Sequence, residues 1–233
     1  QYEVDGELDY ISVTTFNHGH FENFNADIII SNMMNSKNWP NNKYYGMSKQ
    51  DIKDLWELNR NEASQAGTAM HLDIERFYNN EVVDNNSKEF KMFLEFNEDF
   101  KNSLKPWRTE MIVWDKEFKL AGSVDMIFED PITGELSIYD WKRCKEIKKI
   151  NTYGKHGNKF CIMHIPDTNY WHYCLQLNTY KFLIEKNYGK KVKEMYLVCL
   201  HPNYNKYQRI KVCDLTDEVK QLLDIRKQDL KIN

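Results

Sequence analysis

Two acidic residues and a lysine on neighbouring predicted strands are the residues of this sequence best suited to chemistry. Asp140 and Lys142 are separated by one residue, so on a strand both side chains point to the same face. Asp125 lies on the preceding predicted strand, and the turn at residues 130–134 brings it back towards Asp140. Paired carboxylates repel one another unless a cation lies between them. Oxygen ligands of this kind suit Mg²⁺ or Mn²⁺, and a lysine beside them can neutralise charge on a phosphate.

Two predicted helices carry further polar pairs at a spacing of one helical turn. His71 and Glu75 share a helix face, and a neutral imidazole can join carboxylates in a metal site, with Mn²⁺ more tolerant of nitrogen than Mg²⁺. Gln176 and Tyr180 repeat the spacing on a later helix, where an amide and a phenol can hold a phosphate or a water molecule. The alternatives are a core histidine, an ion-paired glutamate and ordinary core positions on the later helix.

A third cluster, of cysteines and histidines, invites interpretation as a zinc site. It consists of Cys161, His164, His172 and Cys174. Against zinc, His172 and Cys174 are two positions apart on a predicted helix, which turns their side chains about 200° apart. The five cysteines are an odd number without a CxxC pair, so neither a disulfide framework nor a zinc ribbon is indicated. A reducing compartment is the simplest expectation.

The segment that follows Lys142 is strongly basic, although the protein has a net charge of −3. Between Trp141 and Phe160 there are six lysines and one arginine against a single glutamate. This composition predicts contact with a phosphate backbone, and a solvated loop is the alternative. Thr68, beside Gly67, is a further candidate because a helix can approach a substrate backbone closely there. The predicted contacts in the basic segment are Arg143, Lys145, Lys148, Lys149, Lys155 and Lys159.

The elements that must position these residues follow the order helices, three strands, helix, strand. A helical crossover after the third strand makes part of the sheet parallel. We therefore predict an α/β fold with a mixed central β-sheet flanked by helices. The expected helices are residues 48–60, 62–79, 87–101, 169–187 (closed by Gly189) and 217–230, and the expected strands are 109–114, 120–128, 136–142, 194–200 and 208–212.

Length and composition favour one globular domain. The 233 residues are 41% hydrophobic, which is too apolar for a disordered chain. A mean hydropathy of −0.73 and the lack of a long apolar run exclude a spanning helix. No export signal is visible, which by itself leaves the localisation open. The cysteine usage favours an intracellular, reducing compartment, such as the cytoplasm, the nucleus, an organelle or a virus-infected cell. The expected organisation is a helical and loop-rich lead-in (1–60) packed on a core (61–213), with a C-terminal helix (214–233).

Taken in order, these residues resemble the RecB-type branch of the PD-(D/E)xK nuclease superfamily. The branch includes the mitochondrial genome-maintenance exonuclease and, more distantly, lambda exonuclease. The resemblance covers about residues 64–200, and Asp140 stands where many relatives carry glutamate. Its motifs are Gly67-Thr68-x-x-His71-x-x-Ile74-Glu75, then Glu110 on a strand, Gly122-x-x-Asp125, Asp140-x-Lys142 and Gln176-x-x-x-Tyr180.

The resemblance implies a restriction-endonuclease-like core of order αβββαβ and an enzyme that hydrolyses DNA. It implies an Mg²⁺- or Mn²⁺-dependent exonuclease of DNA repair, recombination or replication, acting on single strands or duplex ends and not on membranes. The matching metal ligands are His71, Asp125, Asp140 and the Trp141 carbonyl, with Glu75 as a further candidate. The matching catalytic residues are Lys142, Asp140, Asp125, Glu110, Gln176 and Tyr180.

Two alternatives remain open from the sequence, and one cofactor is not expected. An endonuclease can use the same fold, because dependence on a DNA end comes from loops. A module that binds nucleic acid without cutting it is the other alternative, although such modules commonly lose the acid–acid–lysine set. Some relatives hold an iron–sulfur cluster, but the spacing of these five cysteines does not match, so no iron–sulfur cluster is predicted.

Overall fold

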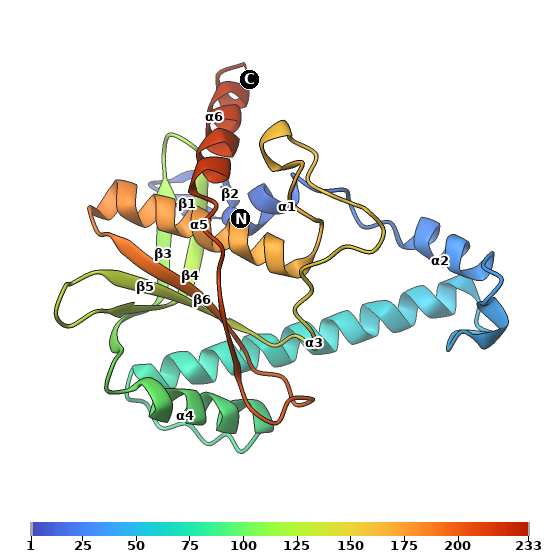
Figure 1. Ribbon diagram of the computed structural model, residues 1–233, viewed down its shortest axis with the longest axis horizontal. Helices are drawn as coiled ribbons and strands as arrows, with labels where there is room; N and C mark the ends of the chain where they lie inside the picture. Colours follow the sequence, from blue (N-terminus) through green and yellow to red (C-terminus); the bar gives the residue numbers. More distant parts are fainter. Residues whose placement is uncertain (1, 233) are drawn as a thin grey trace. The chain divides into compact units, whose positions relative to one another are not determined.

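A mixed β-sheet of seven strands forms the centre of the computed structural model, which describes residues 2–232 (Figure 1). The path along the sheet is β1-β2-β4-β5-β6-β7, and β3 pairs with β4 beside this path. β5 and β6 are parallel, as are β2 and β4, and the other pairs are antiparallel. The strands are β1 (Tyr2–Val4), β2 (Glu7–Ser12), β3 (Lys105–Asp115), β4 (Leu120–Glu129), β5 (Leu136–Lys142), β6 (Val192–Cys199) and β7 (Gln208–Lys211).

Helices cover both faces of this sheet, which confirms the predicted fold class (Figure 1). No helix that the structure describes in residues 2–232 combines the length and apolar character needed to cross a membrane. The α-helices are α1 (Val13–His18), α2 (Ala26–Met34), α3 (Lys49–Tyr78), α4 (Lys88–Phe100), α5 (Asn169–Tyr188) and α6 (Thr216–Ile232), and two short 3-10 helices are η1 (Trp39–Asn41) and η2 (Phe160–Ile162).

Two apolar clusters pack against the two faces of the sheet. On one face, Ile127 and Ile138 pack with Leu177 of α5 and Leu222 of α6. The other face carries the larger aromatic side chains. Its cluster includes Ile74 of α3, three residues of α4 (Phe90, Phe93 and Phe96), and Tyr139 and Trp141 of β5. β5 is therefore buried on both sides, and its alternating positions point towards α5 or towards α4.

The predicted helix and strand pattern differs from the structure in two places. The expected helices 48–60 and 62–79 form one continuous helix, α3, because residues 59–63 contain no proline or glycine to stop it. The lead-in was expected to consist of loops and helices, but β1 and β2 lie within it, and β2 pairs with β4 at Ile11 and Ser12. Ser12 also caps α1 by accepting a hydrogen bond from the Thr15 amide at 2.9 Å.

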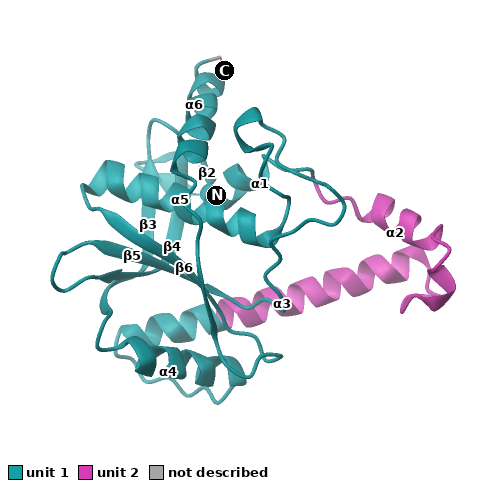
Figure 2. Ribbon diagram, viewed as in Figure 1, with its two compact units in different colours: residues 1–22, 70–233 teal, residues 23–69 magenta. Residues whose placement is uncertain are grey.

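The chain divides into two compact units at residues other than the boundaries expected from the sequence (Figure 2). Unit 1 comprises residues 1–22 and 70–233 and contains the sheet, and unit 2 comprises residues 23–69. Within unit 2, the indole of Trp56 donates to the Tyr44 hydroxyl at 2.9 Å, and Lys53 pairs with Asp27 at 2.5 Å. The expected lead-in of residues 1–60 is therefore split, because its first part joins the sheet.

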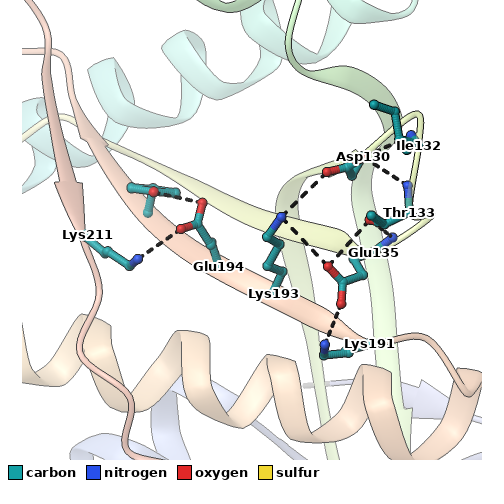
Figure 3. Close-up of polar contacts among 9 residues, drawn as sticks. Asp130, Ile132, Thr133, Glu135, Lys191, Lys193, Glu194 and Lys211 are labelled. Atoms are coloured by element: carbon teal, nitrogen blue, oxygen red, sulfur yellow. Dashed lines mark hydrogen bonds and ion pairs between the residues drawn. The ribbon is translucent and has the colours of Figure 1, made fainter.

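Polar contacts hold the turn between β4 and β5 and the start of β6 (Figure 3). Asp130 accepts backbone N–H bonds from Ile132 at 2.9 Å and Thr133 at 3.0 Å, which closes the turn. Glu135 pairs with Lys191 at 2.5 Å and with Lys193 at 3.9 Å. These ion pairs are largely exposed and contribute little energy, but the closed turn fixes the register of β4 against β5.

Candidate active site

The strand register brings three acidic residues to the same level of the sheet. Met126 of β4 pairs with Tyr139 of β5, which makes Asp125 and Asp140 neighbours across the two strands. The pairs of β3 with β4 on either side of Glu110 place Glu110 across from Asp125 in the same way. Residues directly opposite in antiparallel strands project from the same face. The three carboxylates therefore arise from adjacent positions on β3, β4 and β5.

The alternation of side chains along β4 breaks at Asp125. Val124 packs in the cluster beneath α5, whereas Met126, two positions later, packs in the cluster beneath α4. Opposite this break, Glu110 has a φ of 43°, a left-handed conformation that is costly for a residue with a side chain. The Glu110 carboxylate accepts a hydrogen bond from the Ser123 hydroxyl at 2.7 Å. The left-handed backbone at Glu110 thus occurs together with a carboxylate that Ser123 holds in place.

His71 reaches these carboxylates from α3. Its Nδ1 atom lies 3.6 Å from a carboxylate oxygen of Asp125 and 3.8 Å from one of Glu110. Its other ring nitrogen, Nε2, lies 2.8 Å from the carbonyl oxygen of Trp141. One potential ligand atom from each of His71, Glu110 and Asp125 lies within 4.8 Å of the others. Among the described residues, this is the one such group of three histidine, cysteine or acidic side chains.

The charges of this group depend strongly on one another. Burial disfavours the imidazolium of His71, but Glu110, Asp125 and Asp140 outweigh it and raise the His71 pKa to about 9. The same interaction with His71 lowers the pKa of Glu110, against the effect of burial. Burial and the neighbouring Asp140 raise the pKa of Asp125 to about 7. One oxygen of Asp125 also accepts the Trp141 amide N–H at 2.9 Å. Without a cation, the proton on His71 provides the positive charge that balances these carboxylates.

Asp140 forms an ion pair with Lys142 on the same strand. Its carboxylate is 2% exposed, and one oxygen lies 2.7 Å from the Lys142 ammonium. The ammonium also lies 4.6 Å from the centre of the Tyr173 ring, a cation–π distance. Burial opposes the charge on Lys142, but Asp140 and Asp125 outweigh it and raise the lysine pKa. Lys142 therefore stays protonated at neutral pH.

Gln176 and Tyr180 lie together on α5. The Gln176 amide donates to the Tyr180 hydroxyl at 3.2 Å. Burial raises the pKa of Tyr180, so its hydroxyl keeps its proton. The Tyr180 ring covers Gly122 so closely that a Cβ atom at that glycine would lie 2.7 Å from the ring. Gly122 of the predicted motif therefore makes room for Tyr180.

The donor set of His71, Glu110 and Asp125 fits a divalent cation. One imidazole nitrogen and two carboxylates are ligands that Mn²⁺ accepts well and Mg²⁺ accepts less readily. Asp140 is predicted to belong to the same ligand set, and one of its carboxylate oxygens lies 2.7 Å from the Lys142 ammonium. The Trp141 carbonyl, also predicted as a ligand, faces the His71 ring.

Searches for similar proteins leave the family of this chain undefined. No family model and no curated protein matches it. One similar solved structure is a protein of Eubacterium rectale provisionally described as an exonuclease, with 14% identity and a TM-score of 0.41 over 96% of this chain and 79% of that chain. Another is the protein SSO0001, with 13% identity and a TM-score of 0.37 over 97% of this chain and 77% of that chain. Similarity at this level carries no functional argument.

Several other candidate residues lie outside this group. Within residues 2–232, Glu75 has no side-chain ion pair or hydrogen bond to the three ligands. The candidate zinc residues are not gathered: His172 pairs with Asp167 at 2.8 Å, and His164 lies 3.2 Å from Glu218. Thr68 is exposed and belongs to unit 2.

The charged side chains of the basic segment differ in whether they have a partner within the protein. Arg143 is half-buried and pairs with Glu89 at 2.8 Å, which gives it a structural partner. Lys155 pairs with Glu22 at 2.7 Å, and Lys148 lies 3.5 Å from Glu146. The Lys149 ammonium lies 4.4 Å from the centre of the Tyr170 ring. Exposed lysines of this segment are Lys145, Lys148, Lys149 and Lys155, whereas Lys159 is half-buried.

Two residues that contact the site were not assigned to it from the sequence. Ser123 holds Glu110, and Tyr173 lies beneath the Lys142 ammonium. Ser123 lies two positions before Asp125, a spacing that could have indicated it. For Tyr173, the sequence gives no sign of which aromatic ring lies next to the lysine.

Proposed function

We propose that this protein is a divalent-metal-dependent deoxyribonuclease that works as an exonuclease. The observation that carries the proposal is the group of His71, Glu110 and Asp125, with its ligand atoms within 4.8 Å, beside the Asp140–Lys142 ion pair. Three potential ligands next to a protonated amine suit hydrolysis of a phosphodiester. A salt bridge at the surface would not require a carboxylate as buried as that of Asp140.

Each residue of the group has a role in this proposal. His71, Glu110 and Asp125 hold Mg²⁺ or Mn²⁺, with Asp140 as an additional carboxylate across the strand. When bound, the cation supplies a more acidic water and neutralises charge on the phosphate. Binding requires His71 to lose its proton, so metal and proton compete for the imidazole.

Lys142 provides the positive charge that the protein itself contributes. Asp140 at 2.7 Å and the Tyr173 ring at 4.6 Å hold the ammonium in place. A fixed ammonium stabilises the negative charge that develops on a phosphate during hydrolysis, because it does not have to reorganise. Gln176 and Tyr180 support the site from α5, and the close packing of Tyr180 over Gly122 fixes their position.

DNA is the proposed substrate because exposed lysines follow the site directly along the chain. Lys145, Lys148, Lys149 and Lys155 can attract a phosphate backbone in a protein whose net charge is negative. The preference for DNA ends, and a role in DNA repair, recombination or replication, rest on the resemblance of the motifs. An endonuclease on the same fold is the closest alternative. Nicking of covalently closed circular DNA would favour it over a strict exonuclease.

The test of the proposal is cleavage of end-labelled single-stranded and double-stranded DNA with Mn²⁺ or Mg²⁺. We expect cleavage by the wild-type protein and none in the presence of EDTA. Lys142→Ala and Asp140→Asn should each lower the rate by roughly 10²-fold or more. Lys193→Ala is the matched control, because Lys193 is exposed and lies at the other end of the sheet beside Asp130 (Figure 3).

Two outcomes would overturn the proposal. One is cleavage that persists unchanged in Lys142→Ala and Asp140→Asn, which would place the chemistry elsewhere or in a contaminant. The other is DNA binding by the wild-type protein without cleavage under either metal, which would make the protein a binding module.

A further inference from the structure

A pair of cysteines lies directly beside the Asp140–Lys142 strand. Lys142, at the end of β5, pairs in register with Cys199, at the end of β6, and Cys144 follows Lys142 by two residues. The sulfur atoms of Cys144 and Cys199 lie 3.8 Å apart. Of the five free cysteines, Cys144 is half-buried and Cys199 is buried.

We infer that Cys144 and Cys199 form a reversible disulfide when the protein meets a peroxide, so that this pair is an oxidation site beside the candidate active site. Cys144 is the more accessible sulfur and reacts first. Its thiolate attacks the peroxide, the O–O bond breaks, and a sulfenic acid and hydroxide form. The Cys199 sulfur then displaces hydroxide from the sulfenic acid as the S–S bond forms. Overall, two thiols and one hydrogen peroxide give one disulfide and two waters.

The surroundings of the two sulfurs favour this order of reaction. Contact with Cys199 lowers the pKa of the Cys144 thiol, and the Lys142 ammonium lowers it further against the effect of burial. The contact with Cys144 and burial raise the pKa of Cys199. A nucleophilic, accessible thiol beside a buried second thiol is the arrangement found where a sulfenic acid is resolved to a disulfide.

Closing the pair moves the segment that follows Lys142. A disulfide requires an S–S distance of about 2.05 Å, so the sulfurs must approach by nearly 2 Å. Cys199 lies in β6, which is hydrogen-bonded on both sides to β5 and β7, and is the less free to move. Cys144 lies just beyond the end of β5 and must make most of the movement. Because Cys144 is tied to Lys142 by a single intervening residue, we expect the oxidised protein to cleave DNA more slowly. This last expectation rests on the proposed function.

The experiment treats the reduced full-length protein with hydrogen peroxide and maps its cysteines by mass spectrometry of peptides. We expect a Cys144–Cys199 cross-linked peptide, consumption of two of the five thiols, and recovery of both by dithiothreitol. Cys144→Ser should abolish the cross-link, and Cys199→Ala should leave Cys144 oxidised without a disulfide. Cys213→Ser is the matched control, because Cys213 is exposed and should not affect the cross-link.

Different results separate this inference from the proposed function. If peroxide produces no Cys144–Cys199 cross-link in wild-type protein, or produces a cross-link to another cysteine instead, the inference is wrong whatever the protein does to DNA. If the cross-link forms but the reduced protein never cleaves DNA, the oxidation site stands and the nuclease proposal fails. If both hold, peroxide should lower cleavage at least several-fold in wild type and Cys213→Ser, with recovery by dithiothreitol. An equal loss in Cys199→Ala, also reversed by dithiothreitol, would overturn the link between the disulfide and the site.

Discussion

Replacing Asp125 by asparagine should stabilise the protein in the absence of metal while it abolishes cleavage. The Asp125 carboxylate is buried beside Asp140, which raises its pKa from 3.8 to about 7. When folding raises the pKa of an acid, the folded state accommodates the protonated form better than the ionised form. Its ionisation therefore reduces stability as pH rises from 3.8 towards 7. Asparagine keeps the size and the carbonyl that accepts the Trp141 amide at 2.9 Å, whereas alanine would leave that amide without its acceptor.

The magnitude follows from the same pKa. The rise of the Asp125 pKa from 3.8 to about 7 corresponds to a gross cost of about 4 kcal/mol for the ionised carboxylate. Asp125 also attracts the imidazolium of His71, and the variant loses this attraction. We expect a net gain of about 1–3 kcal/mol at pH 7, or roughly 2–10 °C in melting temperature for a chain of this length.

The assay is thermal unfolding in EDTA at pH 5 and pH 7, followed by the same measurement with Mn²⁺. The gain of Asp125→Asn over wild type should be larger at pH 7 than at pH 5, because more of the wild-type carboxylate is ionised there. Mn²⁺ should stabilise wild type and leave the variant unchanged. Asp130→Asn is the control, and it should lower stability instead of raising it. Backbone N–H bonds from Thr133 and Ile132 lower the Asp130 pKa, so the ionised carboxylate stabilises the folded state there. A lower melting temperature for Asp125→Asn in EDTA at pH 7 would refute the reasoning.

Three further substitutions test the packing and the titration of buried groups. Gly122→Ala should lower stability by about 1–3 kcal/mol and slow cleavage, because its Cβ would lie 2.7 Å from the buried Tyr180 ring; unchanged melting and cleavage would contradict the close packing. Gly67→Ala, inside α3 with no atom within 4 Å of the new Cβ, should raise stability by about 0.5–1 kcal/mol in the same unfolding assay, and a loss would contradict the helix there. His20 is 8% exposed. Burial, together with the charges of Lys159 and Arg226, lowers the His20 pKa from 6.5 to about 4. The unfolded chain therefore binds a proton at this histidine more readily than the folded protein does. Wild type should therefore lose about 2 kcal/mol more than His20→Leu between pH 7 and pH 5 in urea unfolding, and parallel pH profiles would show that His20 does not titrate in this way.

The sequence predicted the elements near the site better than those at the N-terminus. The strands 109–114, 120–128 and 136–142 correspond to β3, β4 and β5, because their β-branched and aromatic residues and the turn at 130–134 are strong local signals. β2 was missed although it pairs with β1 through the Asp5-Gly6 turn, a local hairpin signal. Its second pairing, with β4 about a hundred residues later, has no local signal. The continuous α3 was predicted as two helices, whereas residues 59–63 contain no proline or glycine that would stop a helix.

The composition of the site could be predicted further than its detailed geometry. Residue types and spacing indicated His71, Asp125 and Asp140, and strand alternation placed Asp140 and Lys142 on one face. The preference of Asp140 for Lys142 over the ligand group depends on side-chain positions that spacing does not fix. The left-handed conformation of Glu110 also has no sequence signature, because it arises where the strand pair β3–β4 changes the face that its side chains occupy.

The three candidate ligand side chains come from α3 and from the hairpin of β3 and β4, and α4 separates α3 from this hairpin along the chain. A polypeptide that has made only the helix, or only the hairpin, holds one or two of these ligands and cannot retain a cation. Under the proposed function, hydrolysis would therefore require that α3 is packed against the β3–β4 hairpin, and a local opening that detaches the last turns of α3 would abolish it.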